Sequence, residues 1–141
     1  MNNREKGEDL IRTAHRIVAR DLRGAMDEGD FSMAVRRAQE AVELCLKGAL
    51  SILGVEYPKV HDVGKIFTQV VRTRGICAEE DLLQKVAYIS TRLAAERAPA
   101  FYGEKLYGKE EAEEAEQDAE FVLKAVRRLI VSATQSHSRC T

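Results

Sequence analysis

One long helical pattern between positions 30 and 54 constrains the fold more than any other feature of the chain. Its apolar residues recur at steps of three and four, which places them on one face of an α-helix: Ala34, Ala38, Ala41, Val42, Cys45, Ala49, Ile52 and Leu53. Asp30 is a favourable N-cap, and Gly54 is a common residue just after a helix end. The pattern predicts a long amphipathic helix with a clean stop, and by itself it identifies no activity.

Four further segments have the same helical spacing of apolar residues. They span residues 4–26, 62–74, 78–98 and 109–133. Asp62 is expected to cap the segment that it begins, and Pro99 to break or kink the chain after Ala98. The sequence has no strand signal, repeat or internal linker. We therefore predict an all-α fold, an up-and-down bundle of four to five helices.

The length and composition fit one domain in the cytoplasm. The chain has 141 residues, enough to bury a core, so we expect residues 1–133 to form a single bundle and residues 134–141 a disordered tail. Its three cysteines are odd in number and form no CxxC pair, which predicts no disulfide framework and favours a reducing compartment. The polar N-terminal stretch does not resemble a signal peptide, and we expect a cytoplasmic protein without membrane contact.

Several common kinds of chemistry have no motif in this sequence. The net charge is −1, so no overall basic field indicates nucleic acid or an anionic membrane. No glycine-rich nucleotide loop is present, and no histidine stands three residues after a glutamate as a di-iron bundle would need. We therefore expect no metal and no cofactor, and the catalytic residues, if any, are unknown.

The best candidate for a binding site is the segment around Pro99. Arg97 lies near a predicted helix end and is followed by Tyr102, Lys105 and Tyr107, with Phe101 among them. A cation beside exposed rings can hold a phosphate and stack a base. The alternative is that these rings close the end of the bundle or fill a dimer interface. Composition leaves both interpretations open.

Two other groups have a functional and a structural interpretation. A row of arginines in the first helix could bind phosphates, or could be a solvated face balanced by Asp9, Asp21 and the acidic start of the last helix: Arg12, Arg16, Arg20 and Arg23. The neutral overall charge favours the solvated face. His61 and Asp62 could belong to a site, or could be a loop histidine bonded to a carbonyl and a helix cap.

Three blocks of the chain together resemble the HEPN domain, in its small stand-alone prokaryotic form. They read GDFSMAVRRAQEAVELCLKGALSILGVEYPKVHDVG, RLAAERAPAFYG and YGKEEAEEAEQDAEFVLKAV. The first block carries the features most typical of the family: Ala38, Ala41, Glu43, Leu46, Lys47, Gly54, Pro58, His61 and Asp62. The likeness spans roughly residues 30–128.

The resemblance implies a helical bundle that forms symmetric dimers, often paired with a minimal nucleotidyltransferase in a toxin–antitoxin-like system. Active members of the family are metal-independent RNases with an Arg-x4-6-His motif at the dimer cleft. Arg97 matches the arginine, but the positions open to the histidine hold Tyr102, Gly103 and Glu104. A tyrosine with a pKa of about 10 is a poor base at neutral pH. The motif therefore does not support RNase activity.

Three hypotheses follow. The leading one is a non-catalytic or degenerate HEPN protein, a homodimer that pairs with a nucleotidyltransferase or binds a nucleotide or RNA near Arg97 and Tyr102. Further binding candidates are Lys105, Tyr107, Lys47 and His61. The second is a metal-independent RNase toxin in which His61 or another group replaces the missing histidine. The third is a structural adaptor with no ligand.

Overall fold

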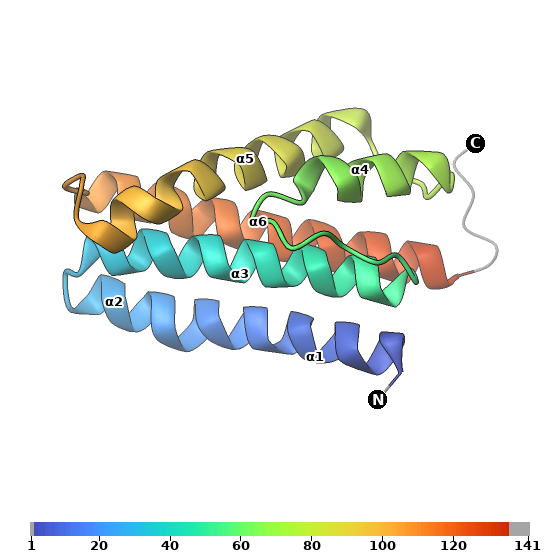
Figure 1. Cartoon of the computed structure of the whole chain (residues 1–141), viewed down its shortest axis with the longest axis horizontal. Coiled ribbons are helices and arrows are strands. Elements are labelled where there is room, and N and C mark those ends of the chain that lie inside the picture. Colours follow the sequence, from blue (N-terminus) through green and yellow to red (C-terminus); the bar gives the residue numbers. More distant parts are fainter. Residues whose placement is uncertain (1, 136–141) are drawn as a thin grey trace.

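The computed structural model describes residues 2–135, which form five helical segments (Figure 1). The first segment is continuous but contains a π-helical stretch, η1, between two α-helical parts. The elements are α1 (Asn3–Arg16), η1 (Ile17–Leu22), α2 (Arg23–Asp27), α3 (Phe31–Ile52), α4 (Gly64–Thr73), α5 (Glu80–Tyr102) and α6 (Lys109–Thr134). The described part contains no strand, and the predicted all-α bundle is confirmed.

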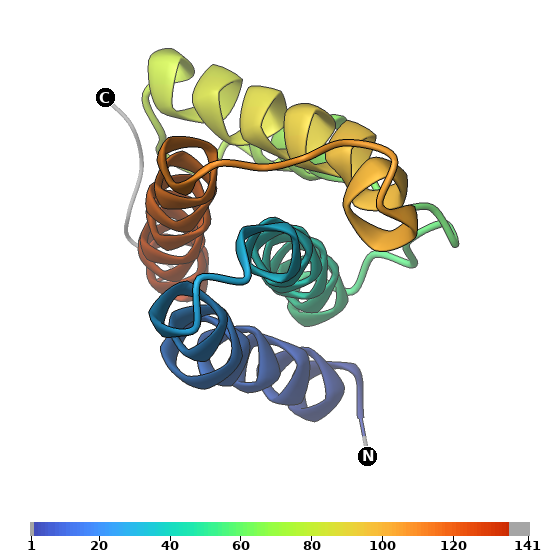
Figure 2. The same cartoon turned by 90° about the vertical axis from the view of Figure 1, so that its left-hand side faces the viewer.

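α3 is the central helix of the bundle. Figure 2 shows α3 between α1, α5 and α6, while the shorter α4 lies against α5. Small side chains let its neighbours come close, because Ala34, Ala38, Ala41 and Ala49 are at most 1% exposed. One side of α3 is not covered by another helix, and the loop of residues 53–63 passes along part of it (Figure 1).

α1 and α3 touch through their backbones. A Cβ atom on Gly7 would lie 2.4 Å from the carbonyl oxygen of Gly48, and one on Gly48 would lie 2.7 Å from the carbonyl oxygen of Gly7. Nearby, the Ser51 hydroxyl donates to the carbonyl of Asn3 at 2.8 Å. Only glycine at both positions permits this approach, so the pair determines where α1 crosses α3.

Both predicted ends of α3 agree with the structure. The Asp30 side chain accepts a hydrogen bond from the Met33 N–H at 3.2 Å, as an N-cap does. Gly54 has a φ of +74°, the left-handed conformation that favours glycine after a helix.

Of the break or kink predicted after Ala98, the break is wrong, because α5 continues through Pro99 to Tyr102. A proline inside a helix removes one hydrogen bond, to the carbonyl four residues earlier. That carbonyl belongs to Ala95, an exposed residue, so water can solvate it. The helix ends at Gly103, whose φ is +67°, and the Glu104 N–H then bonds to the Pro99 carbonyl at 3.0 Å.

Asp62 is not the N-cap of α4, contrary to the sequence-based prediction. The N-cap is Val63, and the Asp62 carboxylate accepts from the Gly64 N–H at 3.2 Å. It also accepts from the hydroxyls of Ser90 and Thr91 on α5, each at 2.7 Å. These tertiary bonds place Asp62 one residue earlier than local capping preference suggests.

Two further findings concern the cysteines and the chain end. Cys45 is a buried free thiol, and burial raises its pKa to about 12. Cys77 is disulfide-bonded, although the sequence predicts no framework of several disulfides. That removes the cysteine argument for a reducing compartment, and the cytoplasmic location stays a prediction. Positions 136–141 of the predicted tail lie outside the described residues.

Within residues 2–135, no helix has both the length and the apolar character needed to cross a membrane.

The glycine contact leads to a stability prediction. Gly48→Ala should destabilise the fold by about 1–3 kcal/mol, because its methyl group would push α1 away from α3. The matched control is Gly24→Ala in α2, where the new Cβ meets no described atom within 4 Å other than those of its chain neighbours and of its own helix backbone. The control should stabilise by about 0.5–1 kcal/mol, since alanine is the better helix former. Urea unfolding followed by circular dichroism measures both; equal effects of the two variants would contradict the contact.

Candidate functional site

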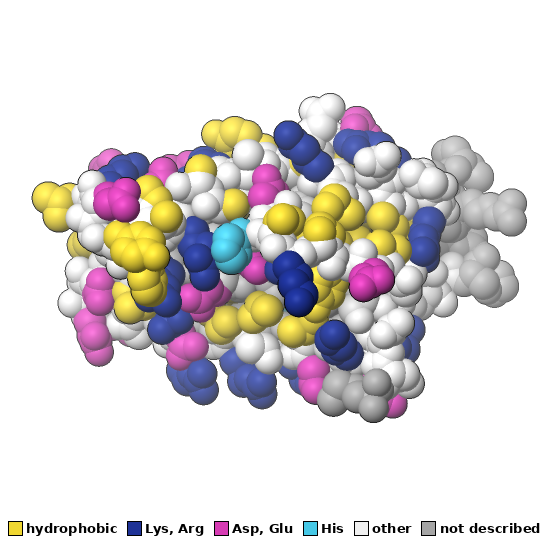
Figure 3. Space-filling view, viewed as in Figure 1, with side chains coloured by type: hydrophobic (Ala, Val, Ile, Leu, Met, Phe, Trp, Pro, Cys, Tyr) yellow, Lys and Arg dark blue, Asp and Glu magenta, His cyan; other side chains and the backbone are white. Residues whose placement is uncertain are grey.

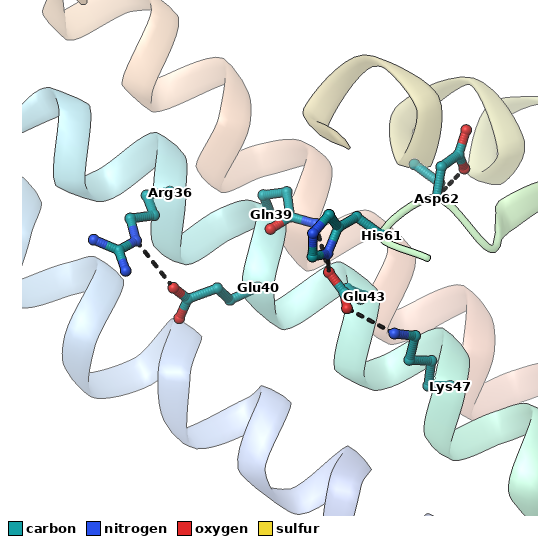
Figure 4. A network of polar contacts seen from close by, with 8 residues as sticks. Arg36, Gln39, Glu40, Glu43, Lys47, His61 and Asp62 are labelled. Atoms are coloured by element: carbon teal, nitrogen blue, oxygen red, sulfur yellow. Dashed lines mark hydrogen bonds and ion pairs between the residues drawn. The ribbon is translucent and has the colours of Figure 1, made fainter. Parts of the chain in front are cut away.

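Five polar side chains lie along one side of α3, and of these Gln39 is buried, with 2% exposure. Their spacing of three and four residues places them on one face of the helix, and we call them the α3 polar strip: Arg36, Gln39, Glu40, Glu43 and Lys47 (Figure 4). The strip is only partly open, since the side chain of Arg36 is 27% exposed and that of Lys47 is 13% exposed. A polar face on the central helix of a bundle calls for explanation, because burial of such groups costs free energy unless they are paired.

Glu43 is the centre of the strip. Its carboxylate accepts from Gln39 Nε2 at 2.9 Å and from Lys47 Nζ at 2.8 Å. The loop between α3 and α4 adds His61, whose Nδ1 lies 2.9 Å from Glu43 Oε1 (Figure 4). Because Nδ1 faces the carboxylate, the opposite edge of the ring faces outward, and 52% of the His61 side chain is exposed.

These contacts keep Glu43 ionised. Burial raises the pKa of its carboxyl group, but hydrogen bonds from Lys47, Gln39 and His61 outweigh burial and hold the pKa below its usual value. Lys47 also lies near the ring of Tyr57, with Nζ 5.4 Å from the ring centre. The result is a partly buried carboxylate held between a lysine and a histidine.

Asp62 fixes the histidine from the other side of the loop. Asp62 directly follows His61 in the chain. Its three hydrogen bonds to α5 and to the start of α4 hold this part of the loop in place. Burial raises the pKa of Asp62, but hydrogen bonds from Thr91, Ser90 and the Gly64 N–H outweigh burial and hold the pKa below its usual value. His61 therefore projects from an anchored backbone rather than from a free loop.

Arg97 and Tyr102 flank the beginning of the strip. The guanidinium of Arg36 lies 4.1 Å from the ring centre of Phe101, which in turn contacts the Tyr102 ring edge-on. α5 runs antiparallel to α3 (Figure 1), and Arg97 precedes Phe101 by one helical turn, about 6 Å. Arg97 thus lies on the α3-facing side of α5, level with the segment that follows Arg36. It is half-buried and forms no hydrogen bond or ion pair with any other described residue.

Lys105 and Tyr107 have structural contacts of their own. The Tyr107 hydroxyl donates to the Glu96 carboxylate, and burial together with Glu96 raises its pKa. Lys105 pairs with Glu96 at 3.4 Å and with Glu111 at 3.1 Å. These contacts join the α5–α6 connection to both helices, as the bundle-closing interpretation expects. Tyr102 differs, because its side chain is 69% exposed.

The structure brings two candidates together that the sequence treated separately. Lys47 and His61 meet through Glu43, which was not among the predicted site residues. The available signal was a glutamate four residues before a lysine, a spacing that brings the two side chains together on a helix. In the space-filling view a histidine lies among Lys, Arg, Asp and Glu side chains, with hydrophobic groups on either side (Figure 3).

The arginines of the first helix mostly have carboxylate partners. The pairs are Arg12 with Asp9, Arg20 with Asp21, and Arg23 with Asp27 and Glu116. Arg16 is different, because within the described residues it donates to the Thr13 hydroxyl at 3.1 Å and forms no ion pair. In residues 2–135, no three His, Cys, Asp or Glu side chains lie close enough together to hold a metal ion.

Glu43 should make stability depend on pH. Its folded pKa is below the usual 4.5, so its contribution is present above that value and is lost as the pH falls through the folded pKa. Glu43→Gln should therefore lower the free energy of unfolding by about 1 kcal/mol at pH 7, and the difference from the wild type should shrink in acid. The control is Glu120→Gln, at an exposed position. Urea unfolding at pH 7 and in acid, below the folded pKa of Glu43, measures the free energies. A difference between Glu43→Gln and the wild type that does not change with pH would contradict the pairing.

Comparison with known proteins gives one match. The family model of the HEPN domain matches residues 7–129, which is most of the chain and includes α3, the loop with His61, and α5. No curated protein and no solved structure matches significantly. The resemblance read from the sequence blocks is confirmed. The chain belongs to the HEPN domain family.

Proposed function

We propose that this HEPN protein binds RNA or a nucleotide, without cleaving it, on the face that joins the α3 polar strip to Arg97 and Tyr102. The observation that carries the proposal is Arg97, a half-buried cation with no anionic partner in the described part of the chain. A guanidinium in this state is suited to a phosphate, which accepts charge-assisted hydrogen bonds. The exposed ring of Tyr102 can stack a base in the same region.

The absence of a histidine after Arg97 supports binding rather than catalysis. The family motif places its histidine after four, five or six intervening residues, and these positions after Arg97 hold Tyr102, Gly103 and Glu104. None of these residues is a histidine, the residue that transfers protons in the family motif. Arg97 then keeps the phosphate-binding half of the motif without its proton-transferring half.

We further propose that the protein is a homodimer whose interface adjoins this face. Three large hydrophobic side chains are exposed at this end of the bundle: Phe101 at 48%, Tyr102 at 69% and Leu106 at 94%. Exposed apolar groups this close together suit an interface. A two-fold axis near them would bring both copies of Arg97 into one cleft.

The proposed partner is a minimal nucleotidyltransferase, in a toxin–antitoxin-like pair, because the family resemblance implies one. An adjacent gene for such an enzyme, and co-purification of the two products after co-expression, would support this pairing. Separate elution of the two proteins would count against it.

RNA binding can be tested by fluorescence anisotropy with a labelled single-stranded RNA. Arg97→Gln should weaken binding by about tenfold, and Tyr102→Ala by a similar factor, since one stacked base contributes about 1–3 kcal/mol. The control is Lys124→Gln, which removes a charge from the exposed face of α6 and should change affinity less than twofold.

The oligomeric state should be measured on the same variants by light scattering. If Arg97→Gln and Lys124→Gln weaken binding equally, the site is elsewhere. Tyr102→Ala could break the dimer without changing RNA binding, or while neither the wild type nor any variant binds RNA. Either result would favour the structural adaptor, in which these rings serve the dimer interface.

A second candidate function rests on His61. Its Nδ1 contacts the ionised Glu43 while the outer edge of the ring is exposed. A carboxylate that orients a histidine in this way is the usual support for general acid–base catalysis. As the alternative to simple binding, we infer that the protein is an RNase in which His61 is the general base.

The RNase alternative predicts metal-independent cleavage. RNA incubated with the protein in EDTA should be cut by the wild type and left intact by His61→Asn, with Arg97→Ala also reduced by at least tenfold. Glu43→Gln should retain part of the activity if Glu43 only orients the ring. Equal cleavage by all variants would indicate a contaminating nuclease and rule out this assignment.

A further inference from the structure

A separate pocket lies between α1, the end of α3 and α6. Its volume is about 520 Å³, and its apolar lining comes from Ile11, Ile52, Ile130 and Val131. It shares no lining residue with the α3 polar strip or with the Arg97 segment. Small-molecule sites in proteins commonly have volumes of about 300–1,000 Å³ and an apolar lining.

The path of α1 creates this pocket. The glycine contact holds the first half of α1 against α3, and Figure 2 shows α1 lying far from α6 at its beginning and approaching it toward α2. The π-helical η1, a form in which helices often change direction, lies where the chain reaches α6. Aliphatic side chains of α1 and α6 therefore face the gap instead of each other, and Val131 is 50% exposed.

The rim of the pocket is positively charged. Arg4 and Arg12 are paired with Glu8 and Asp9, but Arg16 and Arg127, which also line the pocket, form no ion pair within the described residues. His15 lies on the same rim.

The field at this rim acts on His15. Burial lowers its pKa, and the charge of Arg127 lowers it further. The rim therefore repels an added proton, and an anion would relieve this excess positive charge.

We propose that this pocket binds an alkyl carboxylate, with the carboxylate at the rim near Arg16 and Arg127 and the alkyl chain over Ile11, Ile52 and Ile130. None of the described residues that line the pocket is aromatic and could stack a base, which favours an aliphatic chain over a nucleotide. The guanidinium groups of Arg16 and Arg127, which have no ion pair within the described residues, select an anionic head, and burial of methylene groups favours a long alkyl chain. The site is independent of the proposed RNA-binding face.

Sodium decanoate below its micelle concentration is the probe, and isothermal titration calorimetry is the measurement. The wild type should bind one decanoate per chain. Acetate, which lacks the chain, and decyltrimethylammonium, which carries the opposite charge, should bind at least tenfold more weakly. Thermal unfolding should shift upward with decanoate concentration, as for a ligand of the folded state.

Two variants and one control test the location. Arg127→Gln should weaken decanoate binding about tenfold, and Val131→Asp, at a half-exposed position, should weaken it at least as much. Lys124→Gln, one turn earlier on α6 and outside the pocket, should bind as the wild type does. Circular dichroism checks that each variant is folded.

Three outcomes would overturn the proposal. They are wild-type affinity in both pocket variants, equal binding of decanoate and decyltrimethylammonium, and binding to phosphatidylglycerol vesicles without binding of monomeric decanoate. The last result would show that the arginines serve an anionic lipid surface instead. RNA binding is unaffected by any of these results, so the two proposals fail separately.

Discussion

The backbone contact between Gly7 and Gly48 determines much of the arrangement around it. With no side chain on either residue, α1 lies directly on α3 near the N-terminus of the chain. That position takes α1 away from α6 and opens the apolar pocket between them. The close approach of the two glycines therefore governs the pocket at the surface, although neither glycine lines that pocket. Such dependence is expected in a close-packed interior, where helices shift as units.

The second constraint is electrostatic. Glu43 is partly buried on the central helix, and a carboxylate in that position is stable only with partners. Lys47 and Gln39 come from its own helix, but His61 comes from a loop that has to be held in place. Asp62 provides that hold through its bonds to α5. The histidine geometry thus depends on two carboxylates, each satisfied by a different helix of the bundle.

The sequence predicted the helices well because their signals are local. The apolar spacing, Asp30 and Gly54 indicated α3 without any tertiary information. Local rules failed at Pro99 and Asp62, where the surroundings compensate: water can solvate the Ala95 carbonyl, and α5 hydroxyls engage Asp62. For the site, the sequence nominated His61 and Lys47 but not the glutamate that joins them. That contact links positions 18 residues apart, and no spacing rule connects a helix to a loop at such a separation.

The pairing of charges on the α3 side has a consequence for how a ligand reaches it. Arg36 and Arg37 both pair with Glu40, and Lys47 pairs with Glu43, so these three cations of the face are already neutralised, while Arg97 has no partner in the described part of the chain. When the logarithm of the affinity for a single strand is plotted against the logarithm of the salt concentration, the slope steepens by about 0.7 for each phosphate neutralised. A face with so few available cations exerts little long-range attraction. Recognition there would rest on short-range fit and stacking, and its rate of association would be nearly insensitive to ionic strength.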